Sequence, residues 1–324
     1  MKVVLYGSPV TPFCDDLTNR LGKGWTISCV DDATPADDVE ALFADADAVV
    51  AVNYGANAPA SEKLRLIQVP GAGCDGIDIT ALPPGSTLCN VYEHDNAVAE
   101  YVLLALLQWC LRFAEADLAF RNGSWARSSR FGGRPSNELA GKTVGIVGLG
   151  RIGKAVLSRV KPFGTRVVAA RHHDTTPVEG CDRIYHFNEL AKMSEECDFL
   201  VLCSALTAET KGMVDRLVLK AMASHAVIIN VGRGQLIEEK ALYDALSEKT
   251  IGGAVIDVWY QYPDAVNADT LPSRYDFSTL SNLYMTPHIA GWTDGTIERR
   301  FEFIATNLNR VRDGQPPLNV VHRA

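Results

Sequence analysis

Three segments of the chain each place a polar side chain at the end of an apolar run. They are IINVGRGQLI with Arg233, GAVIDVW with Asp257 and YMTPHIAGW with His288. Open α/β sheets bind small ligands at the carboxyl ends of their strands. An arginine there suits a carboxylate, which it holds through two parallel hydrogen bonds, and a histidine there suits general acid–base chemistry. The alternatives are a structural ion pair for Arg233 and a structural role for His288.

A fourth segment is rich in glycine. VGIVGLGRIGKAV places Gly148, Gly150 and Gly153 in G-x-G-x-x-G spacing, after an apolar strand and before a helix that starts near Arg151. In this order the glycines allow a tight turn, close approach to a pyrophosphate, and packing of helix on strand. The segment therefore predicts dinucleotide binding, the alternative being a simple tight turn.

The next apolar strand, RVVAARHHD, should end in the group that reads the adenosine ribose. An acidic residue there accepts hydrogen bonds from the ribose 2′-OH. This chain has Arg171, His172 and His173 instead. Their cationic character favours a 2′-phosphate, so NADP(H) is the expected cofactor. NAD(H) remains possible, with Asp174 serving its ribose, and no metal is expected.

The elements that position these groups alternate between short apolar runs and helix-period segments, which predicts parallel α/β sheets. Asn96 is expected to cap a long helix that starts near Val98. The expected strands are KVVLYG, AVVAV, LIQV, VGIV, RVVAA, DFLVLC, AVIINV and GAVIDV, and the expected helices span 151–163, 188–197, 215–222, 240–249 and 294–312. The polar, Gly-rich segment 121–142 is expected to be a loop or arm.

Length and composition bound the class of protein. A chain of 324 residues exceeds one ordinary core and suggests two domains. The net charge of −8 argues against a nucleic-acid or membrane partner. Eight scattered cysteines without metal-ligand spacing predict reduced thiols. The long apolar segment that begins at Ala99 carries charged residues and predicts a buried helix. We expect a cytoplasmic protein.

The chain resembles the D-isomer-specific 2-hydroxyacid dehydrogenases over nearly its whole length. The motifs VPGAGCDGID, NAVAEYVLLALL, GKTVGIVGLGRIG, LTAETKGMVD, NVGRGQLIEEKAL, GAVIDV and TPHIAGW appear in that family's order. The resemblance implies a Rossmann-type dinucleotide-binding domain, 98–292, inserted in a smaller flavodoxin-like substrate domain, 1–97 and 293–324. An arm at about 110–140, around Trp125, resembles the family's dimerisation segment, so a homodimer is expected.

The resemblance also implies a role for each matching position. Arg233 would bind the substrate carboxylate and polarise the 2-keto oxygen, and His288 would exchange a proton with that oxygen. The N–H groups of Ala72 and Gly73 would hold the carboxylate, and Asp257 would hydrogen-bond the nicotinamide region. Other implied cofactor contacts are Gly148, Gly150, Arg151, Ile152, Gly153, Thr207 and Val231.

The chain departs from the family at Tyr262, where D-V-W-Y-Q-Y-P replaces the usual D-V-F-x-x-E-P. A tyrosine can hydrogen-bond the imidazole but supplies no charge near neutral pH. Three interpretations remain open. Tyr262 takes the third catalytic position as an orienter with a lower pH optimum. Alternatively a carboxylate such as Asp264 or Glu93 replaces it, or the reaction needs no proton, as in formate oxidation.

A second departure is His94, which stands where relatives carry a small polar residue facing the substrate. His94 either adds a cation or proton carrier to the pocket or is a helix-start histidine turned to solvent. The sequence thus predicts an NAD(P)-dependent reductase of a small 2-keto acid, such as glyoxylate, hydroxypyruvate or pyruvate. The alternatives are a formate-type dehydrogenase and a dinucleotide-binding regulatory protein with little catalysis.

Overall fold

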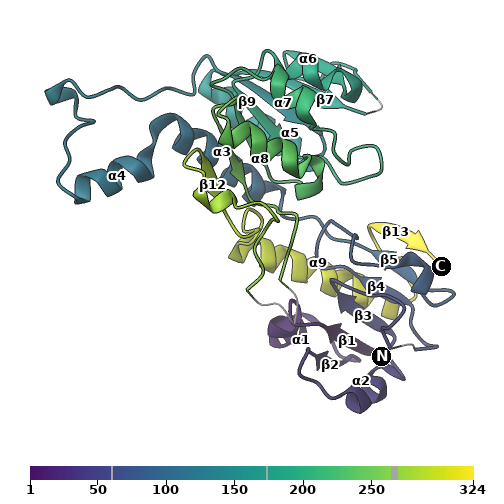
Figure 1. The fold of residues 1–324 in the computed structure, drawn as a ribbon. Helices are drawn as coiled ribbons and strands as arrows, with labels where there is room; N and C mark the ends of the chain where they lie inside the picture. The colour runs from purple at the N-terminus through teal and green to yellow at the C-terminus, as the bar shows by residue number, and fades with distance from the viewer. Residues whose placement is uncertain (60, 173, 264–268) are drawn as a thin grey trace. The chain divides into compact units, whose positions relative to one another are not determined.

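The computed structural model describes residues 1–59, 61–172, 174–263 and 269–324 (Figure 1). They form two compact units. The terminal unit comprises Met1–Glu93 and Thr293–Ala324, and the central unit comprises His94–Trp292. The chain passes from the terminal to the central unit at 93/94, four residues before the expected boundary at 97/98. It returns to the terminal unit at 292/293, the expected position.

The terminal unit consists of one sheet with helices. Its elements are β1 (Lys2–Tyr6), α1 (Cys14–Arg20), β2 (Thr26–Val30), α2 (Ala36–Phe43), β3 (Ala48–Ala51), β4 (Leu66–Gln68), β5 (Thr87–Cys89), α9 (Asp294–Arg312) and β13 (Val320–Arg323). The strand order is β13-β5-β4-β3-β1-β2, and only β13 runs antiparallel to its neighbour. Without β13, this is the 2-1-3-4-5 order of a flavodoxin-like sheet.

Helix α9 spans the predicted 294–312 and returns the chain to the terminal unit. The side chain of Thr293 caps its first turn by accepting from the N–H of Thr296. Phe301, Ile304 and Leu308 are buried one turn apart and pack into the core under β1 and β3. These residues form the apolar face of α9, which covers this sheet.

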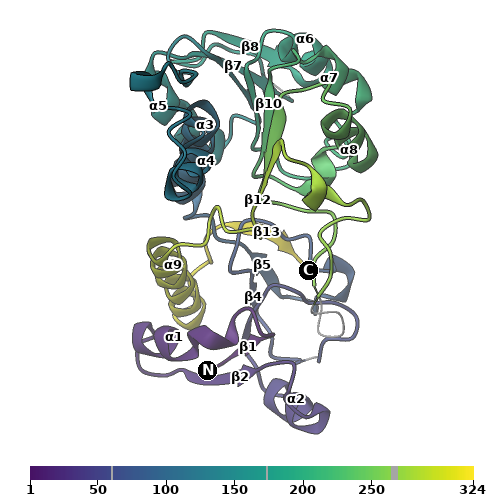
Figure 2. The same cartoon turned by 60° about the vertical axis from the view of Figure 1, so that its left-hand side comes forward.

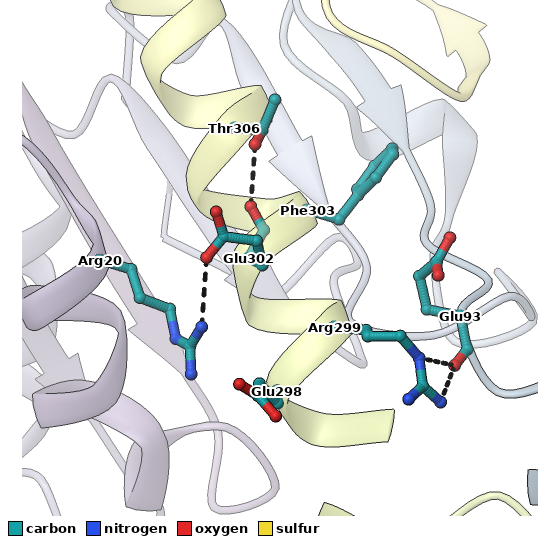
Figure 3. Close-up of a pocket in the computed structure, with 7 residues that line it drawn as sticks. All are labelled: Arg20, Glu93, Glu298, Arg299, Glu302, Phe303 and Thr306. Carbon is teal, nitrogen blue, oxygen red and sulfur yellow. Dashed lines mark hydrogen bonds and ion pairs between the residues drawn. The ribbon is translucent and has the colours of Figure 1, made fainter. Parts of the chain in front are cut away.

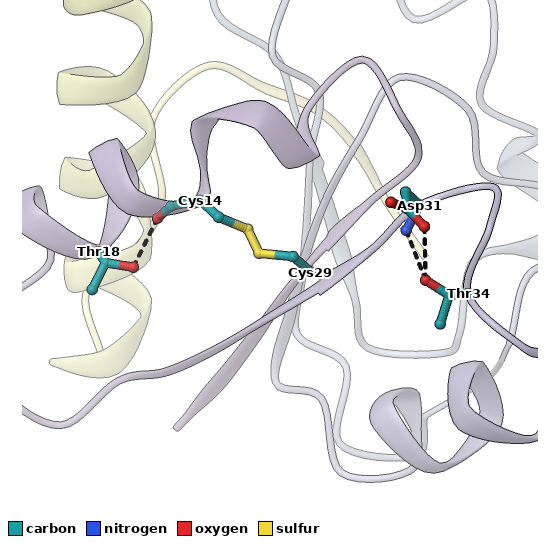
Figure 4. The surroundings of a disulfide bond; sticks show 5 residues. All are labelled: Cys14, Thr18, Cys29, Asp31 and Thr34. Carbon is teal, nitrogen blue, oxygen red and sulfur yellow. Dashed lines mark hydrogen bonds between the residues drawn. A yellow bond between two sulfur atoms is a disulfide. The ribbon is translucent and has the colours of Figure 1, made fainter.

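The terminal unit contains a disulfide between Cys14, at the start of α1, and Cys29, in β2 (Figure 4). Their Cα atoms lie 6.5 Å apart, within the range of disulfides. The expectation of reduced thiols throughout is wrong for this pair. The reason is topological, because α1 packs beside the strand that follows it in the chain. Six other cysteines carry free thiols.

The central unit is built on a parallel sheet with helices on both faces. Its elements are α3 (Asp95–Leu111), α4 (Phe113–Arg121), β6 (Thr143–Val147), α5 (Arg151–Val160), β7 (Arg166–Arg171), β8 (Arg183–His186), α6 (Leu190–Ser194), β9 (Phe199–Leu202), α7 (Arg216–Ala221), β10 (Val227–Asn230), α8 (Glu239–Ser247), β11 (Gly253–Ile256) and β12 (Leu283–Met285). Figure 2 shows α3 and α5 on one face and α7 and α8 on the other.

The strand order in the central unit is β12-β11-β10-β9-β6-β7-β8, and every described ladder is parallel. This is the Rossmann order with one strand added after the sixth. The order reverses between β6 and β9, so the loops after these strands meet at the carboxyl edge. A ligand site is expected at this edge.

Helix α3 begins at Asp95, with His94 at the N-cap position. The expected cap at Asn96 is wrong, because the Asn96 side chain accepts a hydrogen bond from Arg159 of α5 instead.

Among the described residues, no single helix is long and apolar enough for a membrane span. The helices α3 and α4, bent by 56° at Arg112, pass such a test only when taken together.

Helix α4 and the loop after it form an arm, defined here as residues 113–136, that extends from the central unit (Figure 1). Large apolar side chains on the arm are exposed. Trp125 packs edge-to-face against Phe120 and Phe131, although each of the three is more than half exposed. Exposed apolar patches of this kind mark interaction sites.

Candidate active site

The glycine loop after β6 has the conformation that the spacing predicts. Gly148 has φ +93°, and a Cβ on it would collide with the backbone and side chain of Ser204, in the loop after β9. A Cβ on Gly153 would collide with the carbonyl oxygen of Gly148. A Cβ on Gly150 would meet nothing within 4 Å. The first and third glycines therefore serve packing, whereas the second leaves open space beside the backbone.

Helix α5 starts directly at this loop, with Gly150 as its N-cap residue. Lys154 makes the first intrahelical hydrogen bond, to the carbonyl of Gly150. The N–H groups of Arg151, Ile152 and Gly153 thus belong to the first turn and point out of the helix end. Together with the helix dipole, they are suited to a pyrophosphate. The side chain of Arg151 also lies 3.3 Å from Asp95.

The end of β7 brings both candidate ribose-reading groups together. Arg171 lies 3.4 Å from the carboxylate of Asp174. Hydrogen bonds from Thr176, together with the charge of Arg171, hold the pKa of Asp174 below its usual range. The ring of His172 lies 6.0 Å from that of His186, in the neighbouring strand β8. His173 lies outside the described residues.

Two further predicted cofactor contacts lie at the same carboxyl edge. Thr207 is exposed in the loop after β9, where its N–H donates to Thr210 Oγ1 at 2.8 Å. Val231 follows β10 and is buried, and its N–H donates to the carbonyl of Leu202 at the end of β9. The loops after β6, β9 and β10 are thus held to one another by direct contacts.

Asp257 anchors the loop that carries His288. Its carboxylate is buried and accepts hydrogen bonds from Thr286 Oγ1 (2.6 Å), Ile289 N–H (2.8 Å) and Ala290 N–H (2.9 Å). These donors flank His288 on both sides. The predicted contact of Asp257 with the nicotinamide region stays a prediction.

His288 has a left-handed backbone, with φ +59°. A non-glycine residue in this region costs about 1–3 kcal/mol and persists only where its surroundings impose it. The three hydrogen bonds to Asp257 supply that constraint. His288 is exposed, so the strained backbone presents this residue at the surface of the central unit.

Tyr262 is the hydrogen-bond partner of His288. Its phenol oxygen lies 3.0 Å from Nδ1 of the imidazole and accepts a hydrogen bond from the N–H of Trp259 at 3.1 Å. Burial raises the pKa of Tyr262, whereas the Trp259 N–H and the charge of Arg233 oppose this shift and Asp257 adds to it. The phenol is therefore neutral near pH 7. Asp264 lies outside the described residues, and Glu93 belongs to the terminal unit.

Arg233 lies in the loop after β10, with its side chain half-buried. Asn230 fixes this loop by donating to the Arg233 carbonyl at 2.9 Å and accepting from the N–H of Gly232 at 3.1 Å. Gly234 packs against the backbone of Trp259 so closely that a Cβ on it would collide. The central unit therefore brings Arg233 near the Tyr262–His288 pair, as the electrostatic effect of Arg233 on the phenol also indicates.

Comparison with known proteins agrees with this geometry. The family model "D-isomer specific 2-hydroxyacid dehydrogenase, NAD binding domain" matches residues 103–290, which is more than half of the chain. The chain belongs to this family. The chain is 32% identical over 274 residues to the glyoxylate reductase of Thermococcus gammatolerans, covering 82% of this chain and 78% of that protein.

Two other relatives align with almost the whole length of this chain. The glyoxylate/hydroxypyruvate reductase of Arabidopsis thaliana is 27% identical over 98% of this chain and 96% of its own length. The NADPH-dependent glyoxylate/hydroxypyruvate reductase of Sinorhizobium meliloti, solved with NADP and malonate, aligns with a TM-score of 0.77 and 26% identity. The alignment covers 99% of this chain and 97% of that structure. The dehydrogenase is an NAD(P)-dependent enzyme with a Rossmann-type fold, as the sequence predicted.

His94 of the dehydrogenase lies beside the loop that carries His288. A Cβ placed on Gly291, three residues after His288, would lie 3.3 Å from Cβ of His94. His94 is half-buried at the N-cap position of α3. The helix-start position predicted for His94 is confirmed, whereas the direction of its side chain stays a prediction. A role of His94 toward the substrate stays a prediction.

In the terminal unit, Ala72 and Gly73 follow β4 in a half-buried loop. Asn90 donates to the Ala72 carbonyl at 2.8 Å, and Val91 N–H donates to the Gly71 carbonyl at 3.0 Å. Because the C=O and N–H of one trans peptide point in opposite directions, the N–H groups of Ala72 and Gly73 both point away from β5. This orientation suits the predicted donors, whose contact with a carboxylate stays a prediction.

The terminal unit also has an open hollow of about 450 Å³ (Figure 3). Its arginines already donate to groups of the same unit. Arg20 contacts Asp16 and Glu302, and Arg299 contacts the carbonyl of Glu93. We assign no ligand to this hollow.

Three supporting residues were not predicted from the sequence. Thr286 and Trp259 contact the Asp257 and Tyr262 groups described above, and Tyr101 hydrogen-bonds Thr286 at 2.6 Å. Burial raises the pKa of Tyr101 to about 12, so it stays protonated. The only sequence signal was their place inside the quoted motifs NAVAEYV, GAVIDVW and TPHIAGW.

Proposed function

We propose that the chain is a reductase of small 2-keto acids of the glyoxylate and hydroxypyruvate type. The observation that carries this proposal is the pairing of His288 with Tyr262 near Arg233, at the carboxyl edge of a Rossmann sheet. The names of the relatives from Thermococcus, Arabidopsis and Sinorhizobium support the substrate class.

The chain's own residues have separate tasks in this reaction. When bound, the nicotinamide cofactor supplies a hydride to C2 of the substrate. Arg233 binds the substrate carboxylate and stabilises the negative charge that develops on the 2-keto oxygen. His288 presents Nε2 to that oxygen and gives it a proton. Asp257 keeps the imidazole in place through the backbone of its loop.

We further propose that NADPH is preferred over NADH. Arg171 ends the strand that reads the ribose, with His172 beside it. Asp174 is engaged by Arg171 and Thr176, which makes it a weaker acceptor for a ribose hydroxyl. The NADPH dependence stated for the Sinorhizobium relative supports this preference.

The test is NADPH and NADH oxidation with glyoxylate, hydroxypyruvate and pyruvate, beside NAD⁺ and NADP⁺ reduction with formate. We expect turnover of at least one keto acid, faster with NADPH. H288N is expected to lose about 10²–10⁴-fold in kcat, the usual contribution of a general acid. No turnover of any keto acid, or turnover of formate alone, would reject the proposal.

A homodimer formed through the arm is part of the proposal. Phe120, Trp125 and Phe131 make an exposed aromatic cluster that a second copy of the chain would bury. Light scattering should give twice the monomer mass, and the W125A/F131A double variant should be monomeric. A monomeric wild-type protein at micromolar concentration would contradict this part.

We also propose a cytoplasmic location, where the glutathione pool keeps most protein thiols reduced. Six of the eight cysteines are free thiols, in line with such a compartment. Fractionation of the source cells, with thiol trapping of Cys14 and Cys29 at lysis, tests both the location and the state of the pair. Recovery outside the cytoplasm would reject it.

A further inference from the structure

The contact between Tyr262 and His288 allows a hydrogen-bond direction that the usual glutamate cannot provide. The N–H of Trp259 donates to the phenol oxygen at 3.1 Å, which occupies one of its acceptor positions. The phenol also carries a hydrogen that it can donate, and its oxygen lies 3.0 Å from Nδ1 of His288. A carboxylate only accepts, whereas a phenol both donates and accepts.

This difference sets the tautomer of the neutral imidazole. A carboxylate partner requires a hydrogen on Nδ1, which leaves Nε2 of a neutral histidine without one. A phenol that donates to Nδ1 requires the reverse, with the hydrogen on Nε2. We propose that Tyr262 donates to Nδ1 of His288 and so gives the neutral enzyme an Nε2–H donor for the 2-keto oxygen. This inference rests on the proposed reductase function.

The proton balance of reduction follows from the same geometry. As hydride reaches C2, the C2 oxygen takes the proton from Nε2, and the phenol proton of Tyr262 moves to Nδ1. The imidazole ends neutral with its hydrogen on Nδ1, and Tyr262 ends as a phenolate. An alkoxide is a far stronger base than a phenolate, so the transfer runs downhill. Because Tyr262 is 47% exposed, water can return its proton after each turnover.

Burial raises the pKa of Tyr262, and two neighbouring groups act against this shift to stabilise a transient phenolate. The Trp259 N–H already points at the phenol oxygen, and the positive charge of Arg233 lowers the pKa of Tyr262. Asp257 acts in the opposite sense, but its carboxylate is neutralised in part by the three hydrogen bonds that it accepts. Among the described residues of the central unit, Arg233 and Asp257 are the charged groups that act on this phenol.

Tyr262 is thus a positioning residue. Its phenol gives a proton to Nδ1 of His288 while Nε2 gives a proton to the substrate oxygen. The consequence is a pH dependence unlike that of a histidine acting alone. A lone imidazole donates only as the imidazolium, which becomes scarce above an ordinary histidine pKa of about 6.5. With Tyr262 in place, hydride transfer should continue until the phenol itself ionises, well above pH 8.

The test measures single-turnover hydride transfer by stopped flow, from pH 5.5 to 9.5, with NADPH and hydroxypyruvate. We expect the wild-type rate to vary by less than about threefold between pH 6 and 8.5. Y262F keeps the ring but has no hydroxyl, and its rate should fall about tenfold per pH unit above the imidazole pKa. Y262E should show the same fall at a higher pH, because its charge stabilises the imidazolium.

A second readout does not depend on activity. In ¹⁵N-histidine-labelled protein at pH 8, with H288N to assign the signal, the wild type should show protonated Nε2 and unprotonated Nδ1. Y262E should show the reverse. A wild-type rate that falls as in Y262F, or an Nδ1–H tautomer in the wild type, would overturn the inference while leaving the reductase function intact.

The D264N variant tests whether the carboxylate of Asp264, rather than the phenol of Tyr262, assists His288. If Asp264 rather than Tyr262 assists His288, D264N will alter the pH profile and Y262F will not. That result would also overturn the inference. Absence of turnover with any keto acid, together with the predicted tautomer, would instead reject the proposed function alone.

Discussion

Asp257 holds both peptide N–H groups that follow His288. The carboxylate also accepts from Thr286, two residues before the histidine, so His288 lies in a loop that is held on both sides. The left-handed backbone of His288 is the cost of this arrangement. Asp257 therefore positions His288 through the backbone of its loop.

Substituting Asp257 should separate this role from general stability. D257N removes an acceptor and places an amide N–H₂ among donors, which leaves buried N–H groups unsatisfied at about 1–3 kcal/mol each. We expect kcat to fall at least about 100-fold, because a displacement of 1 Å can cost that much. T286V removes one donor of the three and serves as the milder control. A D257N enzyme with near wild-type kcat would contradict the anchoring role.

The glycine loop offers a matched pair of variants. G153A should destabilise the protein, because the added Cβ collides with the Gly148 carbonyl. G150A should fold normally, because its Cβ meets nothing within 4 Å, yet bind the cofactor at least tenfold more weakly. Thermal unfolding and NADPH fluorescence titration measure the two effects. Unchanged cofactor affinity in G150A would show that the phosphates bind elsewhere.

Cofactor choice should depend on the end of β7. R171A removes the cation proposed to bind the 2′-phosphate and should lower the NADPH/NADH ratio of kcat/KM about 10- to 100-fold. R183A is the control, because Arg183 lies in the neighbouring strand and stacks on Tyr185 instead. An unchanged ratio in R171A would remove the basis for an NADPH preference.

The buried carboxylate of Glu239 predicts an acid-dependent part of stability. Burial alone would raise its pKa, but hydrogen bonds from Arg274 and Ser273 outweigh burial and hold the pKa below its usual range. A lowered folded-state pKa gives stability that is present above the unfolded value of about 4.3 and lost as pH falls through the folded value.

E239Q should therefore melt below the wild type at pH 7, since one or two kcal/mol correspond to about 1.5–3 °C in a chain of 324 residues. The difference should shrink below about pH 4. Thermal unfolding between pH 3.5 and 8 measures it, with E238Q, next along the chain and exposed, as the control. A difference that stays constant with pH would contradict the assignment.

The sequence predicted much of the fold because its strongest signals are local. Apolar runs such as VVL and VII became buried strands, and the segment 294–312 became α9. The short strands β5 and β8 were not predicted, since three or four residues of mixed polarity carry little periodic signal. They are strands because neighbouring strands pair with them.

Site residues could be predicted where the spacing within a motif determines which residue occupies which position. Asp257 and Pro263 placed Tyr262 in the slot beside His288, and the structure brings the two together. The Trp259 N–H and the Tyr101 hydroxyl were missed, because their roles depend on tertiary contacts that spacing does not encode. The disulfide between Cys14 and Cys29 was missed for the same reason.

The most direct test of the proposed function follows the hydride itself. Enzyme, glyoxylate and NADPH deuterated at C4, as the 4R and 4S forms separately, are incubated, and the glycolate is analysed by mass spectrometry. The proposal predicts glycolate with one deuterium at C2 from one of the two forms, formed about 10²–10⁴-fold more slowly when H288N replaces the wild type. Bound NADPH without deuterium transfer from either form to glyoxylate, hydroxypyruvate or pyruvate would contradict it.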